Sequence, residues 1–367
     1  MNHVMARRVV VDTNILVQSP RLNSGSWRAL RRAGERGEIE LYFPKICIIE
    51  AEAWFERERM SRVAAFDKAR SRLAQLGARI WPDSQSSPEV PSDQAEYLTE
   101  RLARAGTILP IPAITHEQLV RRASQHRHPF NEHGSGYRDA LIWESVCDLT
   151  AGGPLVFLTQ NSHDFGVAPD LFEDLQADLV ERGVPAENVT LESILVRVIE
   201  ALVPADDVVR GETERTLNNS NALDRLGEGM GESLLFGEGL PYVPSRGELP
   251  EWFGEPVAEM IWDPSNVRVA QAHPVDEDSY LVSGSLQADG RIYSILNRAE
   301  WASVPDRERN LLSGVDEDYR EDVAAVIHRP VIVQFEAVFT PPSDIADVDV
   351  LSIEPDTAGR GSSDRSR

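Results

Sequence analysis

Four acidic residues stand where a chain of alternating strands and helices could bring their carboxylates together. Asp12 directly follows the apolar run 9–11, Glu50 comes shortly after a second apolar run, Asp139 opens a helical pattern, and Asp164 follows the run 154–159. Crowded carboxylates repel one another and raise one another's pKa values. One or two Mg²⁺ or Mn²⁺ ions would relieve that repulsion, activate a water molecule and stabilise the leaving oxygen of a phosphodiester.

The elements that must position these acids follow from the apolar patterning. Short β-branched or aromatic runs predict buried strands at residues 9–11, 40–43, 78–81, 154–159 and 189–191. Helical patterns are predicted at residues 24–36, 45–76, 93–105, 115–124, 137–149, 169–182 and 192–202. This alternation predicts an α/β fold with a doubly wound parallel sheet and flanking helices. Strand tips and helix starts share one edge of such a sheet, so the four acids can meet there.

Four stretches, in this order and setting, resemble the motifs of PIN-domain nucleases. They are Val-Val-Val-Asp12-Thr-Asn14, the segment 44–50, Gly-Tyr-Arg-Asp139-Ala-Leu-Ile-Trp and Phe-Leu-Thr159-Gln-Asn161-Ser-His-Asp164-Phe. The resemblance covers roughly residues 8–202. It implies a metal-dependent endoribonuclease in which Mg or Mn is held by Asp12, Glu50 and Asp139, with Asp164 expected as a fourth ligand. It also implies that Asn14 and Thr159 support the site.

One position departs from the family's pattern. PIN domains commonly carry an acid two residues after the Thr of the fourth motif, where this chain has Asn161. Asn161 could coordinate an ion through its carbonyl oxygen or hold a metal-bound water, while Asp164 supplies the charge or only caps a helix. The number of ions, one or two, is therefore open. The departure also motivates an alternative, a PIN-like fold kept as a binding or regulatory module.

A run of basic residues precedes the third acid. It includes Arg121, Arg122, Arg127 and Arg138, interleaved with histidines. We expect these arginines to contact the phosphates of a single-stranded RNA substrate, because phosphate contacts position a nucleic acid on a protein. The alternative is an ordinary solvated loop.

Charge is distributed unevenly along the chain. The net charge of −23 divides into −5 for residues 1–200 and −18 for residues 201–367, and the acidic second half should repel nucleic acid. We predict a nuclease domain at 1–203 and a linker at 204–254 that includes a weak helix near 207–217. A smaller antiparallel β-rich domain is predicted at 255–354, with a hairpin turn at Asp289-Gly290, and a disordered tail at 355–367. The acidic domain could recognise substrate, support a homodimer or bind a protein inhibitor. A toxin-like nuclease held by an antitoxin is a further alternative, although such toxins are usually single small domains.

The remaining composition is ordinary for a soluble globular chain, with 41% hydrophobic and 26% charged residues. No apolar run approaches the roughly 18 residues that span a bilayer, so no membrane partner is expected. Cys47 and Cys147 lie in apolar surroundings and are interpreted as small core residues. With so few cysteines and no export signal, we expect a cytoplasmic protein.

Overall fold

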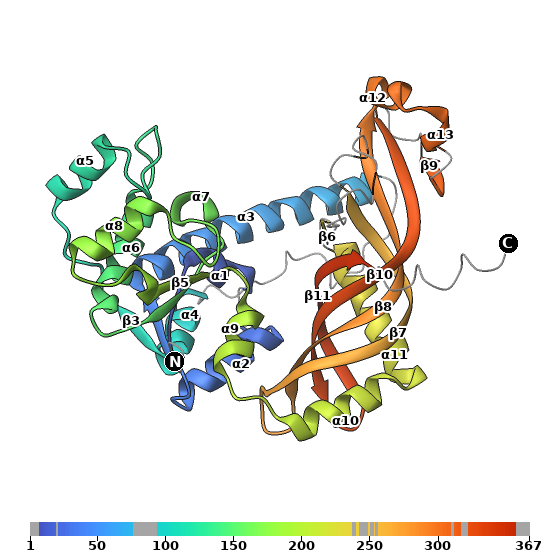
Figure 1. The fold of residues 1–367 in the computed structure, drawn as a ribbon, viewed down its shortest axis with the longest axis horizontal. Helices are drawn as coiled ribbons and strands as arrows, with labels where there is room; N and C mark the ends of the chain where they lie inside the picture. Colours follow the sequence, from blue (N-terminus) through green and yellow to red (C-terminus); the bar gives the residue numbers. More distant parts are fainter. Residues whose placement is uncertain are drawn as a thin grey trace. The chain divides into compact units, whose positions relative to one another are not determined.

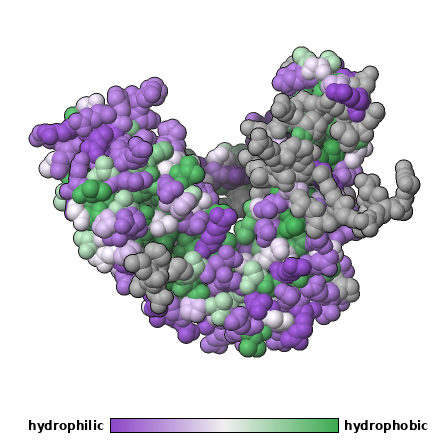
Figure 2. All heavy atoms as spheres, in the orientation of Figure 1, coloured by the Kyte–Doolittle hydropathy of each residue, from purple (hydrophilic) through white to green (hydrophobic). Residues whose placement is uncertain are grey.

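The structure is a computed structural model that describes residues 7–19, 21–75, 94–236, 240–241, 249, 253, 256–309, 312–316 and 322–356. The chain divides into two compact units, Met1–Val203 and Pro204–Arg367 (Figure 1). The strand predicted at 78–81 and residues 357–367 of the predicted tail lie outside the described residues. None of the described helices has the length and apolar character needed to cross a membrane. Hydrophilic side chains cover most of the face shown in Figure 2.

The described part of the first unit contains a parallel sheet of five strands in the order β3-β2-β1-β4-β5. The strands are β1 (Arg8–Val11), β2 (Glu40–Pro44), β3 (Thr107–Leu109), β4 (Leu155–Leu158) and β5 (Val189–Glu192). In the central strand β1, Val10 is in register with Tyr42 on one side and Phe157 on the other. Val9, Val10 and Val11 are fully buried, which explains why a run of β-branched residues stands here. The predicted fold class is confirmed.

Helices flank this sheet in the described part of the first unit (Figure 1). They are α1 (Thr13–Gln18), α2 (Gly25–Glu35), α3 (Lys45–Gln75), α4 (Gln94–Ala105), α5 (His116–Ser124), α6 (Tyr137–Thr150), α7 (Ser162–Phe165), α8 (Glu173–Glu181) and α9 (Leu195–Leu202). Thr115 begins α5 through a capping box with Gln118. The short helices α1 and α7 were not expected from the sequence, because neither completes two turns of apolar repeat.

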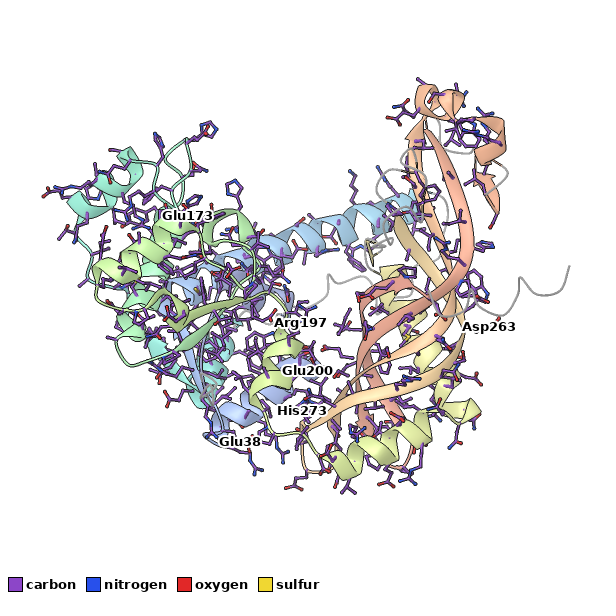
Figure 3. All side chains as sticks on the ribbon, viewed as in Figure 1. Glu38, Glu173, Arg197, Glu200, Asp263 and His273 are labelled. Carbon is purple, nitrogen blue, oxygen red and sulfur yellow. The ribbon has the colours of Figure 1, made fainter. Side chains whose placement is uncertain are left out.

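The second unit is built around an antiparallel sheet with strands in the order β11-β10-β8-β7-β6, and β9 pairs with β10. The strands are β6 (Leu240–Pro241), β7 (Val257–Pro274), β8 (Tyr280–Asn297), β9 (Gly314–Asp316), β10 (Asp322–Thr340) and β11 (Asp344–Pro355), and the short helices α12 (Arg298–Ser303) and α13 (Asp306–Arg309) lie between β8 and β9. The register of β7 shifts around Asp263 (Figure 3) and Asn266, whose φ angles are 52° and 51°. Such bulges increase the twist of a long strand.

The hairpin turn predicted at Asp289-Gly290 is wrong. Both residues lie inside the continuous strand β8, where Gly290 pairs with Ile261 of β7 and Arg329 of β10. A Cβ atom on Gly290 would lie 3.0 Å from a methyl carbon of Val331. The glycine therefore allows close approach within a sheet, and that requirement replaces the turn that the dipeptide suggested.

The linker predicted at 204–254 is corrected over its first part. Residues there form α10 (Asp207–Leu217) and α11 (Ser220–Phe236), and their buried side chains Leu217, Leu226 and Met230 belong to the core of the second unit. Helix α10 coincides with the weak helix predicted at 207–217, whereas sparse apolar positions and several glycines hid α11. Gly229 lets α11 lie against β11, because a Cβ atom there would be 2.7 Å from the Val348 side chain.

Helix α10 and the residues around it also cover the outer edge of β7. The Asn218 side chain accepts a hydrogen bond from Val267 N at 3.0 Å and donates one to Val267 O at 2.9 Å. Glu214 accepts from Val269 N at 2.9 Å, and Asp206 N donates to Ala272 O at 2.8 Å. These contacts take the place of the backbone hydrogen bonds that a neighbouring strand would make with β7.

Candidate active site

Asp12 is held at the end of the central strand by its neighbours in sequence and in space. Its backbone N–H donates to Leu158 O at 3.0 Å, which joins the ends of β1 and β4. One carboxylate oxygen accepts from Thr13 N at 2.6 Å, so Asp12 begins α1 as its N-cap. The other accepts from the Thr159 hydroxyl at 2.6 Å and from the Asn14 amide at 2.8 Å. Asp12 is only 3% exposed.

Asn14 and Thr159 tie the two strand ends together beneath this carboxylate. The Asn14 amide donates to the Thr159 hydroxyl at 3.2 Å, and the Asn14 carbonyl accepts from Gln160 N at 3.1 Å. Asn14 is thus fixed in orientation, with its nitrogen toward Asp12 and its oxygen toward Gln160. This arrangement suits the supporting role expected for both residues.

Glu50 comes to the same edge from the second turn of α3. One oxygen accepts from the Thr13 hydroxyl at 2.8 Å, and the other pairs with the Arg138 guanidinium at 2.5 Å. The Glu50 side chain is 14% exposed, whereas that of Arg138 is 66% exposed. Arg138 therefore lies at the surface directly over the first turns of α3.

Asn161 joins Asp139 and Asp164 through its side-chain amide. The Asn161 amide nitrogen donates to Asp139 at 3.2 Å and to Asp164 at 2.8 Å. His163 contacts the other oxygen of Asp164 through Nδ1 at 2.9 Å. The bridging amide lies between two carboxylates, a place where a cation would also be stabilised.

Electrostatic coupling shows that these acids share one region. Burial raises the pKa of Asp12 from 3.8 to about 6, and the charges of Asp139 and Glu50 add to the rise. Burial also raises the pKa of Asp139, with further contributions from Asp164 and Glu50. The pKa of the Cys47 thiol, 3.8 Å from Asp12, is raised well above its usual range, mainly by burial, which keeps it protonated. It is therefore no nucleophile.

The residues fit a divalent ion by their chemistry, since all four acids offer the hard oxygen atoms that Mg²⁺ and Mn²⁺ prefer. Within the part of the chain that the structure describes, no three His, Cys, Asp or Glu side chains already surround one point as a metal-binding group. The contacts above explain this arrangement, because Arg138 and the Asn161 amide occupy the oxygens of Glu50, Asp139 and Asp164. Binding an ion would require these donors to move.

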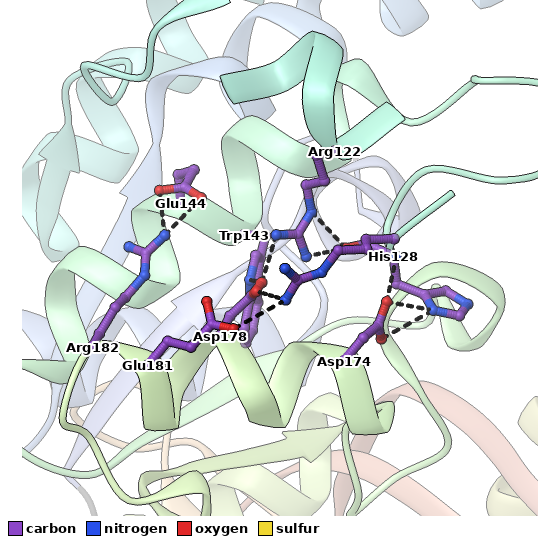
Figure 4. A network of polar contacts seen from close by, with 9 residues as sticks. Arg122, His128, Trp143, Glu144, Asp174, Asp178, Glu181 and Arg182 are labelled. Atoms are coloured by element: carbon purple, nitrogen blue, oxygen red, sulfur yellow. Dashed lines mark hydrogen bonds and ion pairs between the residues drawn. The ribbon is translucent and has the colours of Figure 1, made fainter. Parts of the chain in front are cut away.

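The arginines predicted to contact phosphate divide into two groups. Arg122 and Arg127 pair with Asp178 of α8 at 2.6 and 2.5 Å, and Asp178 also accepts from Trp143 Nε1 at 2.9 Å (Figure 4). Asp178 is 5% exposed, and the network joins α8 to α6 through Trp143, to α5 through Arg122 and to the segment after α5 through Arg127. Arg121 instead lies at the surface, paired with Glu117 of the preceding turn at 3.0 Å.

The sequence reasoning missed two side chains that contact the acids. The Thr13 hydroxyl holds Glu50, and His163 contacts Asp164. Thr13 could have been found from its place between Asp12 and Asn14, since a hydroxyl at a strand end commonly donates to a nearby acceptor. Nothing in the pattern around His163 distinguished it from a solvated histidine.

Comparison with known families identifies this unit. A family model described as the PIN domain matches residues 9–165, a segment that contains β1, the long helix α3, α6 and the loop after β4. The second unit has no family match. Searches of curated proteins and of solved structures gave no match. PIN domains are generally nucleases and typically use divalent metal ions. The first unit of this chain is therefore a member of the PIN-domain family.

Proposed function

We propose that the first unit is a metal-dependent endoribonuclease that hydrolyses single-stranded RNA. The observation that carries this proposal is electrostatic coupling at the carboxyl edge of the sheet, where the charges of Glu50 and Asp139 add to the raised pKa of Asp12 and the charge of Glu50 adds to that of Asp139. A buried cluster of like charges is unfavourable by itself and becomes favourable when a cation is bound. Asp12, Glu50 and Asp139 would hold Mg²⁺ or Mn²⁺, with Asp164 as a further ligand.

The chain's own residues then have distinct roles. When bound, the ion supplies an activated water and stabilises charge on the leaving oxygen of the phosphodiester. Asn14 and Thr159 keep the Asp12 carboxylate oriented, because both donate to the same oxygen. Arg138, released from Glu50, is placed to bind a phosphate group of the substrate, since a guanidinium matches phosphate geometry.

The test is cleavage of single-stranded RNA by the full chain with Mg²⁺ or Mn²⁺. We expect cleavage by the wild type and a loss of at least about 100-fold in Asp12→Asn and in Asp139→Asn. Asp148→Asn is the matched control, because Asp148 lies on the same helix as Asp139 but is exposed. Cleavage that survives both site substitutions, or that is absent with either metal, would contradict the proposal.

A second function is favoured by one observation, the bridge that the Asn161 amide makes between Asp139 and Asp164. A neutral donor that already satisfies both acids lowers the need for an ion, and the unit would then act as a PIN-like binding or regulatory module. Calorimetric titration with Mn²⁺ separates the two functions. Binding at or below millimolar concentration supports the nuclease, and no binding in that range supports the module.

A further inference from the structure

The outer half of α3, residues 56–73, is a solvated helix that extends past the rest of the first unit (Figure 1). Most of its side chains are exposed, and Glu58, Arg59, Val63, Asp67 and Arg70 are partly shielded. The segment carries six basic and three acidic residues, a net charge of +3 within a chain of net charge −23. The outer half of α3 is therefore a positively charged surface on a protein that is negatively charged as a whole.

The basic residues of this segment are of two kinds. Three of them neutralise the segment's acids one turn away, in the pairs Arg59–Glu56 at 2.5 Å, Arg62–Glu58 at 2.5 Å and Arg70–Asp67 at 3.2 Å. The other three are Arg57, Lys68 and Arg72, and within the described part of the chain no acid pairs with them. The whole excess charge of the segment therefore belongs to these three side chains.

The three lie in a line that begins at the candidate active site. A helix of 3.6 residues per turn places residues 50, 57, 61, 68 and 72 within about 60° of one another on one face. Glu50 is the acid that α3 contributes to the site, so the same face continues outward as Arg57, Ser61, Lys68 and Arg72 for about 33 Å. Arg138, paired with Glu50, lies at the head of this row.

The opposite face of the helix has a different character. By the same helical geometry, Arg59, Arg62 and Arg70 fall about 140–220° away from Arg57. Their charges are compensated by the acids they contact, so this face is nearly neutral. The helix therefore presents a cationic row on the side of Glu50 and an ion-paired surface on the other side.

We propose that Arg57, Ser61, Lys68 and Arg72 form a track that binds the sugar–phosphate backbone of the single-stranded nucleic acid on which the site acts. The proposal rests on the proposed nuclease function. A strand whose phosphate is at Glu50 and Arg138 can continue along α3, where guanidinium, ammonium and hydroxyl groups meet successive phosphates without reading bases. The charge of the row is complementary to a polyanion, and the track lies entirely within the first unit.

The experiment compares two triple variants of the full chain that remove the same charge from the same helix. The row variant is Arg57→Gln, Lys68→Gln and Arg72→Gln, and the matched control is Arg59→Gln, Arg62→Gln and Arg70→Gln. Glutamine keeps a long side chain and a good helix propensity, and circular dichroism checks that both variants keep the wild-type helix content. Binding of fluorescein-labelled oligouridine is followed by anisotropy in EDTA at several salt concentrations.

The expected result follows from counterion release. Losing three phosphate contacts should reduce the slope of log affinity against log salt by about 2 and weaken binding on the order of 100-fold at about 0.1 M salt. The control variant should keep the wild-type slope. Equal losses in both variants, no loss in the row variant, or no binding by the wild type would overturn the proposal.

Two further outcomes test whether the row binds RNA and whether that binding is separate from cleavage. If the row variant binds RNA more tightly than the wild type, the row does not bind nucleic acid, and the proposal is overturned. Binding is measured without metal, so it does not depend on cleavage. A wild-type chain that binds RNA through the row but cleaves none supports the track and contradicts only the nuclease function.

Discussion

The fold buries the Asp12 carboxylate away from water. The variant Asp12→Asn measures how much folding stability this burial costs when no cation is bound. Burial raises its pKa from 3.8 to about 6. A rise of about 2 units corresponds to about 3 kcal/mol of lost stability when the group is fully ionised. The Asn side chain carries no charge, so the variant escapes this cost. It also removes one of the two acceptors of the Asn14 amide, the one at 2.8 Å, a loss of about 1 kcal/mol.

The sign of the effect depends on pH. Below pH 3.8 the carboxyl group is protonated in both the folded and the unfolded chain, and there is no penalty. As pH rises toward 6 the unfolded chain ionises first, so the folded wild type loses stability, and above 6 the loss is complete. We therefore expect Asp12→Asn to stabilise the metal-free first unit by about 2 kcal/mol near pH 7.5 and to leave it nearly unchanged near pH 4.5.

Hydrogen exchange measured by mass spectrometry is the suitable assay, because it reports the opening of β1 and β4 rather than of the whole chain. Wild type and variant are compared in EDTA at the same pH, so that intrinsic exchange rates cancel. Near pH 7.5, exchange of β1 should slow about 30-fold in the variant. The control Asp148→Asn should change neither value. An equal effect at both pH values, or faster exchange near pH 7.5, would refute the reasoning.

Three other substitutions test features of the site and the fold. Asn161→Asp places a third anion between Asp139 and Asp164, so Mn²⁺ should bind about tenfold more tightly by calorimetry, and unchanged affinity would contradict the bridging role. Asp178→Asn removes the charge partner of Arg122, whose side chain is 11% exposed, and the nearer of the two acids that pair with Arg127. It should lower the free energy of unfolding by about 2 kcal/mol in urea, whereas the exposed Glu181→Gln should change it by less than about 0.5 kcal/mol. Gly284→Ala puts a Cβ atom 2.3 Å from the Arg268 carbonyl oxygen and should lower the thermal midpoint of the second unit, while Gly231→Ala, with open space around it, should raise it slightly.

The sequence predicted the parts of the fold that rest on local pattern. The run 9–11 identified a buried strand because β-branched residues without polar interruptions have few other places in a protein. Lys45–Gln75 was predicted within a residue, since nothing inside it breaks a helix. The Asp289-Gly290 turn failed because the same two residues suit a tight turn or a close strand contact, and only the neighbour Val331 decides between them.

The sequence predicted that the acids lie near one another, but it did not predict the partners of the arginines. The carboxylates stand at strand ends and helix starts, positions that the topology alone brings together. The partners of the arginines depend on side chains far away in sequence, as Arg127 depends on Asp178, 51 residues later. Proximity to Asp139 in the chain therefore did not indicate which arginines face the solvent and which hold the fold together.

The edge of β7 has a consequence for how the protein behaves at high concentration. Strands of 18 or 19 residues, such as β7, β8 and β10, would offer a long template for pairing with the same strand of another molecule if an outer edge were open. Asn218 prevents this at the middle of β7 by occupying both ladder groups of Val267, as a peptide unit would. Asn218, together with Glu214 and the backbone of Asp206, thus closes a stretch of edge at which two sheets could otherwise pair. The Asn218 contact does not depend on salt, unlike repulsion between acidic surfaces.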